Sequence, residues 1–182
     1  SSESRGLGDV YKRQLKMHVF NRARLIKNSK NRIPYGVDLI QKYKRESWIV
    51  FTENKKQAKE FNKIINTKGF KSALYNTDLD STERLENLNK FKKADLNVLV
   101  TCTALDEGFD MPEADGALIL SASSSKRQRV QRMGRVLRIT ENKPNALIVT
   151  VYSSKTEFDK LMEEAKRYHK EGVPVSWKRQ DR

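Results

Sequence analysis

Residues 126–138 carry two arginines and an amide at spacings that could hold phosphate groups. On a helix with about 100° between successive residues, Gln131, Arg135 and Arg138 fall on one face. The apolar residues gather on the opposite face: Val130, Met133, Val136 and Leu137. Guanidinium groups aligned in this way can bind a polyphosphate and stabilise the charge that develops on a transferring phosphoryl group. The alternative interpretation is an amphipathic helix with a solvated basic face.

A second group of polar residues follows the apolar run that ends at Val100. Thr101 and Thr103 offer hydroxyl groups that could bind the backbone phosphates of a nucleic acid. Gly108 permits close approach of the main chain, and Asp110 could accept a hydrogen bond from a ribose hydroxyl. Parallel sheets bind ligands beyond the carboxyl ends of their strands, where this loop is expected to lie. The alternative is a capped turn without a ligand.

Several catalytic and metal-binding patterns are absent from the sequence. None of the eight glycines is followed by lysine, so there is no G-x-x-x-x-G-K-[ST] loop to hold phosphates. Asp106 and Glu107 do not directly follow a predicted strand, which argues against a Walker B magnesium site. Cys102, His18 and His169 provide neither a zinc-ligand cluster nor an internal disulfide. We therefore predict no metal site, and we expect no ATP hydrolysis by this chain alone.

The positive charge of the sequence is concentrated in one segment. The 182 residues include 37 Lys and Arg against 23 Asp and Glu, a net charge of +14. Residues 126–143 contain seven basic residues and one acidic residue, and most of the seven are arginines suited to bidentate phosphate contacts. A polyanion partner is indicated. Because no apolar run reaches the roughly 18 residues of a membrane span, we expect an intracellular, cytoplasmic protein, nucleoid-associated if bacterial or phage.

Five short apolar runs predict strands that are buried on both faces. They are residues 48–51, 72–75, 96–100, 117–120 and 146–151. Helices are expected between them, with starts at Asn54, Asp80 and Ser154. Their predicted inward residues are Ala58, Phe61 and Ile65, then Leu85, Leu88 and Phe91, then Phe158, Leu161, Met162 and Ala165. Alternating strands and helices predict an α/β fold, a parallel sheet with helices on both faces.

The two ends of the chain depart from this alternation. Residues 1–14 show no periodicity and are interpreted as a tail or a non-native remnant. Residues 15–45 are basic and predict two helices interrupted near Pro34, a lead-in or linker to the main domain at 46–170. Residues 171–182 are interpreted as a polar tail without assigned structure.

Taken in order, these segments resemble the second RecA-like lobe of superfamily 2 helicases and translocases. Residues 49–52 are similar to motif IV, and residues 80–91, with Arg84, are similar to the S-x-x-x-R-x-x-x-L-x-x-F segment that follows it. Residues 100–112 are similar to motif V, T-x-x-x-x-x-G-x-D-x-P, and residues 131–138 match motif VI, Q-x-x-G-R-x-x-R. The resemblance covers roughly residues 47–168.

This resemblance implies a role for each matching residue. Arg135 and Arg138 would reach as catalytic arginine fingers to ATP and Mg²⁺ bound on a first RecA-like lobe of the same protein. The ATP-binding residues would be Gly108, Asp110 and Gln131, and the nucleic-acid backbone would be contacted by Thr52, Arg84, Thr101 and Thr103. The chain would then be one motor lobe of an ATP-dependent helicase.

The resemblance leaves open which nucleic acid is bound and whether the lobe is catalytic. Motif VI begins with Gln131 rather than the histidine of the DEAD-box proteins, and Asn76-Thr77 replaces their His-Gly. The arginine-rich string is closer to XPB-like, phage and restriction-type DNA helicases, so DNA is favoured over RNA. The alternatives are a non-catalytic RecA-like lobe that binds nucleic acid or protein, an RNA helicase lobe, and, ranked last, a small-molecule enzyme.

Overall fold

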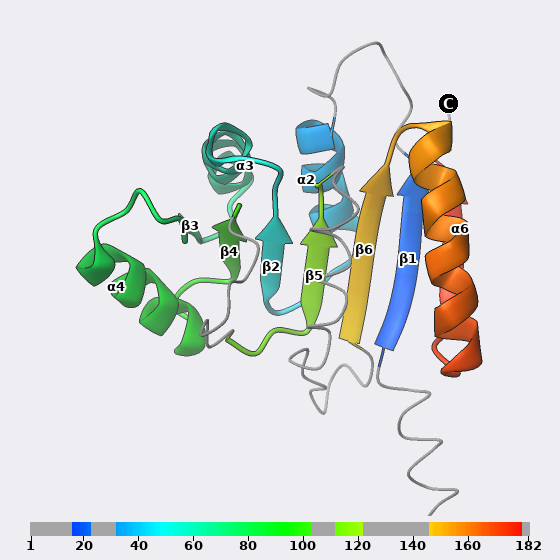
Figure 1. Cartoon of the computed structure of the whole chain (residues 1–182). Coiled ribbons are helices and arrows are strands. Elements are labelled where there is room, and N and C mark those ends of the chain that lie inside the picture. The colour runs from blue at the N-terminus through cyan, green and yellow to red at the C-terminus, as the bar shows by residue number, and fades with distance from the viewer. Residues whose placement is uncertain (1–15, 23–31, 103–111, 122–145, 180–182) are drawn as a thin grey trace, which may run out of the picture.

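Seven parallel strands form the centre of the molecule in the computed structural model, which describes residues 16–22, 32–102, 112–121 and 146–179. The strand order is β3-β4-β2-β5-β6-β1-β7, and every neighbouring pair is parallel (Figure 1). The strands are β1 (Lys16–Arg22), β2 (Trp48–Phe51), β3 (Ser72–Leu74), β4 (Val98–Thr101), β5 (Gly116–Ile119), β6 (Ala146–Tyr152) and β7 (Val175–Arg179). The predicted α/β fold with a parallel sheet is confirmed.

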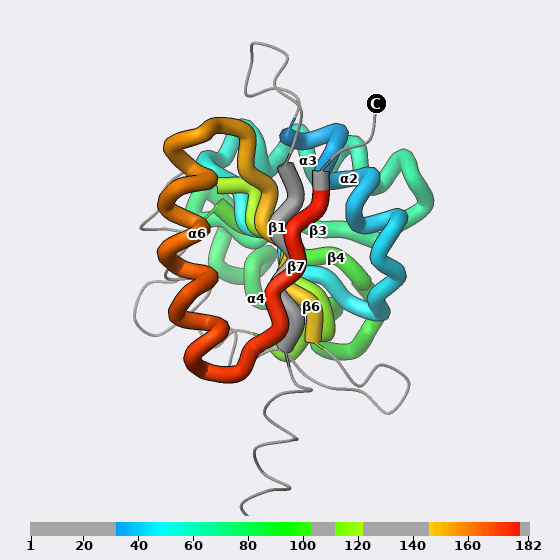
Figure 2. The backbone as a smooth tube through the Cα atoms, turned by 90° about the vertical axis from the view of Figure 1, so that its right-hand side faces the viewer, coloured from blue at the N-terminus to red at the C-terminus, as the bar shows by residue number. Residues whose placement is uncertain are grey.

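Helices cover both faces of this sheet, as Figure 2 shows from the β7 side. The helices of the described residues are α2 (Arg32–Lys42), α3 (Lys55–Thr67), α4 (Ser81–Lys92) and α6 (Lys155–Lys170). Side chains alternate along β2, so that Trp48 and Val50 join the core under α2 and α3, while Ile49 and Phe51 join the core under α4. None of these helices is long and apolar enough to cross a lipid bilayer.

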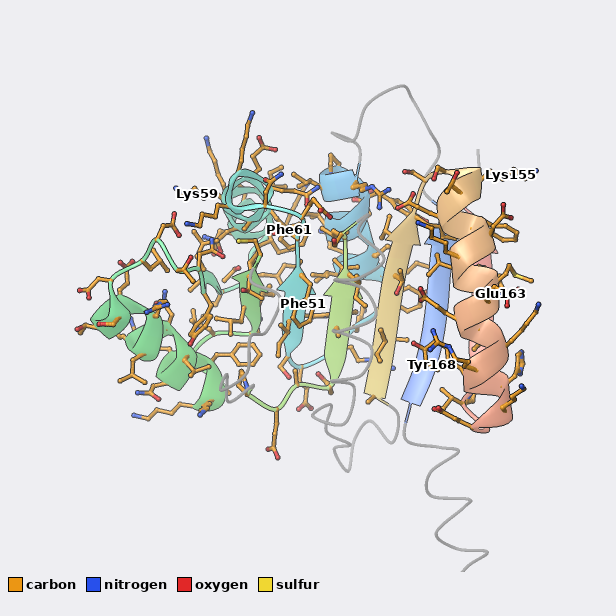
Figure 3. The ribbon with its side chains drawn as sticks, viewed as in Figure 1. Phe51, Lys59, Phe61, Lys155, Glu163 and Tyr168 are labelled. Carbon is orange, nitrogen blue, oxygen red and sulfur yellow. The ribbon has the colours of Figure 1, made fainter. Side chains whose placement is uncertain are left out.

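The helix starts predicted from the sequence are confirmed at Asn54, Asp80 and Ser154. The Asn54 side chain accepts a hydrogen bond of 2.9 Å from the backbone N–H of Gln57. Ser154 and Glu157 form a complete capping box at the start of α6. On α3, Phe61 points into the core while Lys59 projects to solvent (Figure 3).

Two apolar residues predicted to face inward are exposed instead. Leu85 on α4 is 57% exposed and Met162 on α6 is 38% exposed, although Leu88, Phe91, Leu161 and Ala165 are buried as expected. Strand β3 is also only half-buried, because it forms the edge of the sheet opposite β7. Helical spacing identified which residues share a face, but burial depends on what packs there.

Two predictions for the ends of the chain are wrong in part. Residues 15–45 do not form two helices, and the tail left without structure contains strand β7. Residues 16–22 form β1, which lies between β6 and β7 rather than in a helix. A single helix, α2, runs through Pro34 and buries Ile33, Val37 and Ile40 in the core. Pro34 lies in the first helical turn, where the missing N–H has no partner to lose. These residues therefore complete the sheet and its core.

Candidate functional site

The carboxyl ends of the strands lie along one edge of the sheet, because all strands point the same way (Figure 1). Polar residues follow four of these ends in turn: Asn76 after β3, Cys102 after β4, Thr52 after β2 and Ser121 after β5. This is the edge where open parallel sheets bind their ligands. We take it as the candidate site.

Thr52 and Thr101, both predicted to bind nucleic acid, lie side by side at this edge. The backbone N–H of Thr52 donates a 2.9 Å hydrogen bond to the carbonyl of Thr101. The Thr52 hydroxyl donates to the carbonyls of Asn54 and Thr101, at 3.2 and 3.4 Å. Both threonines are 1% exposed. In this conformation the Thr52 hydroxyl therefore contacts the backbone where β2 and β4 end. The nucleic-acid role of both residues stays a prediction.

Arg84 lies on α4, away from these two threonines along the chain but on a helix that packs against β3 and β4. Its side chain is half-buried, and its backbone N–H donates to the Asp80 carbonyl at 2.9 Å. The helix is tied to the sheet by Asn87, whose Nδ2 donates to the Leu74 carbonyl at 2.9 Å. The backbone of Arg84 is thus held in place relative to the sheet. Its contact with nucleic acid stays a prediction.

The remaining predicted site residues lie outside the described part of the chain. They are Thr103, Gly108, Asp110, Gln131, Arg135 and Arg138. The described residues next to them are Cys102, before residue 103, and Ser121, before residue 122. Both of these flanking residues are at the carboxyl edge, so the segments that carry the rest of motif V and all of motif VI each follow a strand end of the candidate site.

Sequence reasoning missed the side chains that hold these two flanking residues. The Oδ1 atom of Asn76 accepts a 3.1 Å hydrogen bond from the backbone N–H of Cys102. The Ser121 hydroxyl donates to the carboxylate of Glu53. Asn76 and Glu53 each lie two residues after the end of a strand. Because parallel sheets bind ligands beyond the carboxyl ends of their strands, this position in the sequence could have identified both residues.

A buried ion pair closes the β6 end of the same edge. Arg32, at the start of α2, contacts the Glu157 carboxylate at 2.7 Å and donates to the Val151 carbonyl at 3.1 Å. Burial raises the pKa of Glu157, but the hydrogen bonds from Arg32 and from the backbone of Ser153 and Ser154 outweigh it and hold the pKa below its usual range. The charged pair is the structural fastening between α2, β6 and α6.

Helix α3 presents a lysine face beside the candidate site. Lys55, Lys56, Lys59 and Lys63 are all exposed, and they fall within about 100° of one another on the helix. Together they extend about 12 Å along the helix axis from its first residue. Lys59 forms an ion pair of 3.3 Å with Asp78. We call these four residues the α3 lysine face; it is a positive surface that starts next to Thr52.

The described residues contain no group of three or more His, Cys, Asp or Glu side chains that could hold a metal ion. We therefore assign no metal ligand within 16–22, 32–102, 112–121 or 146–179. The chemistry of the described edge is that of hydrogen bonding and positive charge.

Comparison with known proteins gives these features a family. Residues 31–140 match the model of the helicase conserved C-terminal domain. The chain belongs to this family. The parallel sheet described above is the centre of this domain, which is the C-terminal RecA-like lobe of superfamily 2 helicases. The predicted resemblance is therefore confirmed.

Relatives of this helicase C-terminal domain include a DNA translocase and an rRNA helicase. The DNA 3'-5' translocase XPB2 of Sulfurisphaera tokodaii is 36% identical over 129 residues, which are 71% of the chain and 28% of the translocase. The ATP-dependent rRNA helicase RRP3 of Scheffersomyces stipitis is 25% identical over 118 residues, 65% of the chain and 24% of the helicase. The chain thus spans roughly a quarter of the length of these relatives.

A solved structure supports the fold of this domain. The structure of S. cerevisiae Dbp5 bound to RNA and ADP BeF3 matches with a TM-score of 0.68 and 19% identity. The match covers 92% of the present chain and 42% of the Dbp5 chain. At this identity the likeness establishes the fold alone.

Proposed function

We propose that this domain is the second motor lobe of an ATP-dependent helicase or translocase. The observation that carries the proposal is the family match over residues 31–140, which includes the positions of motifs IV, V and VI. The first RecA-like lobe of the same protein is the partner that binds ATP with Mg²⁺. The 182-residue chain alone has no Walker A sequence, so we expect it to be inactive.

In this proposal two arginines of motif VI complete the ATP site. The guanidinium groups of Arg135 and Arg138 stabilise the charge on the γ-phosphoryl group, while Gly108, Asp110 and Gln131 contact the nucleotide. ATP binding draws the two lobes together and hydrolysis releases them. Each cycle moves the backbone-gripping residues of this lobe relative to those of its partner.

The nucleic acid is held by its phosphates, through the carboxyl edge of the sheet and the α3 lysine face. Thr52, Thr101, Thr103 and Arg84 are the proposed contacts from motifs IV and V and from α4. The α3 lysine face adds positive charge next to Thr52, which favours a polyanion at this position. Contacts to phosphates rather than bases make binding largely independent of sequence. DNA is preferred over RNA in this proposal, on the strength of the XPB-like motif VI.

The test is the substitution Arg135→Ala in the protein that carries both lobes. We expect ATP turnover to fall about a thousandfold or more, because an arginine finger contributes that much to turnover, while binding of a labelled strand changes little. Arg167→Ala is the matched control, since Arg167 is exposed on α6, and it should leave turnover unchanged.

Two outcomes would change the proposal. Unchanged turnover in Arg135→Ala would remove the arginine-finger assignment. A parent reading frame without a Walker A lobe, together with strand binding but no ATP hydrolysis, would favour the non-catalytic binding lobe instead. Competition between DNA and RNA strands of the same sequence decides the preferred nucleic acid.

A further inference from the structure

The amide of Asn76 continues the pairing of β3 with β4 beyond the point where their backbones separate. The last backbone bond of the pair runs from the N–H of Tyr75 to the carbonyl of Val100, at 2.8 Å. One residue beyond Tyr75 and two beyond Val100, the Asn76 side chain accepts a hydrogen bond of 3.1 Å from the backbone N–H of Cys102. Cys102 lies within motif V, residues 100–112, so this bond holds the backbone near the start of that motif.

Asn76 is an unfavourable residue for a purely structural position. It is 0% exposed, and within the described structure its Nδ2 group has no hydrogen-bond partner. A buried donor without an acceptor destabilises the fold, and a leucine of similar size would avoid that cost. The amide contributes one thing that leucine lacks, which is the acceptor for Cys102.

The backbone at the end of β4 is held from two sides. Thr52 donates its N–H to the carbonyl of Thr101 at 2.9 Å, from the β2 side. Asn76 accepts the N–H of Cys102 from the β3 side. The single peptide group between Thr101 and Cys102 is therefore held at both its carbonyl and its N–H by neighbouring strands.

We propose that Asn76 is a positioning residue for motif V. By holding the N–H of Cys102, it fixes the backbone at the end of β4, immediately before the segment that carries the predicted nucleotide-facing residues Gly108 and Asp110. This inference rests on the proposed function, because it assigns Asn76 an effect on hydrolysis through that segment. Displacement of reacting groups by about 1 Å can lower a rate about a hundredfold.

The same strand pair provides a matched control at its opposite edge. The Oδ1 atom of Asn97 accepts a 2.8 Å hydrogen bond from the backbone N–H of Lys71. Asn97 and Lys71 precede β4 and β3, so this bond lies at the amino-terminal edge. It has the same chemistry as the bond from Cys102 to Asn76, but it is far from the start of motif V along the strand.

The experiment compares Asn76→Leu, Asn76→Asp and Asn97→Leu in the protein that carries both lobes. The readouts are kcat and KM of nucleic-acid-stimulated ATP hydrolysis, with thermal unfolding as a measure of stability. We expect Asn76→Leu to lower kcat about tenfold or more, and Asn76→Asp to recover part of the loss because it keeps the acceptor. Asn97→Leu should leave kcat unchanged even where it lowers the melting temperature.

Each result bears on the inference. A wild-type kcat in Asn76→Leu, or an equal loss in Asn97→Leu, would overturn the positioning role while leaving the proposed function intact. An unsubstituted protein without nucleic-acid-stimulated hydrolysis would overturn the proposed function and this inference with it. If Asn76→Leu does not fold, Asn76→Ala replaces it, because alanine removes the acceptor without adding branched volume.

Discussion

Arg32 and Glu157 are separated by 125 residues in the sequence, and both carboxylate oxygens of Glu157 lie 2.7 Å from Nη2 of Arg32. The arginine begins α2 and the glutamate lies in the first turn of α6, where it also caps that helix. One buried ion pair therefore joins two helices on opposite faces of the sheet across the carboxyl end of β6. It holds the first turns of α2 and α6 at the carboxyl edge of the sheet, where the candidate site lies.

The first prediction concerns the cost of breaking this pair. Arg32→Ala leaves a buried carboxylate without its charged partner, and we expect it to lower the free energy of unfolding by about 3–5 kcal/mol. Arg32→Met combined with Glu157→Leu should cost clearly less than the sum of the single changes, because neither charge is then left unpaired. Urea denaturation of the wild type, the single variants Arg32→Met and Glu157→Leu, and the double variant measures the coupling, and strictly additive effects would contradict it.

The second prediction concerns the pH dependence of stability. The pKa of Glu157 is lowered in the folded state, because its hydrogen bonds outweigh the effect of burial. A lowered carboxyl pKa stabilises the fold above the unfolded pKa of about 4.3, and this contribution is lost as the pH falls through the folded value. The stability difference between the wild type and Glu157→Gln should therefore be largest near neutral pH and shrink below about pH 4. Denaturation at several pH values checks this, and a constant difference would refute it.

The third prediction compares two glycines that lie against the core. A Cβ at Gly116 would come within 2.8 Å of the rigid ring of Trp48, whereas a Cβ at Gly36 would meet the flexible end of Leu120 at 2.9 Å. We expect Gly116→Ala to destabilise the fold by about 1–3 kcal/mol. Gly36→Ala should cost less, because Leu120 can shift and alanine favours the helix by about 1 kcal/mol. Equal losses in thermal unfolding would contradict this difference.

The fourth prediction concerns the α3 lysine face and its proposed contact with phosphates. Lys56→Glu with Lys63→Glu should weaken strand binding and lower the slope of log affinity against log salt by about 1.4, which is about 0.7 for each lost contact. Lys160→Glu with Lys170→Glu makes the same charge change on α6, across the sheet from α3. Fluorescence anisotropy over a salt series compares the two, and an equal loss would indicate net charge alone rather than a site.

Much of the fold follows from local patterns in the sequence. The five apolar runs form strands β2 to β6, and β2, β4, β5 and β6 are buried on both faces, as continuous apolar stretches predict. Asn54 and Ser154 marked helix starts correctly, since a capping side chain acts on N–H groups two or three residues away. Interactions that close within a few residues can be predicted without knowing the rest of the chain.

Other features depended on partners that local patterns do not reveal. Strand β1 was predicted as helix, yet Lys16 pairs with Ala146 and His18 with Ile148, far along the chain. Leu85 has the spacing of a core residue but is exposed, because the position of a helix relative to its neighbours decides which part of its face is covered.

The order of motifs, the caps and the apolar runs were properties of the amino-acid sequence, and they were sufficient to predict the family and strands β2 to β6 of the sheet. The burial of Arg32 and Asn76 was decided by the tertiary structure alone. Both are polar residues of kinds that are usually exposed, and each is stabilised inside the protein by partners from other strands and helices. A buried polar group needs a specific acceptor or donor in space, and only the folded chain provides it.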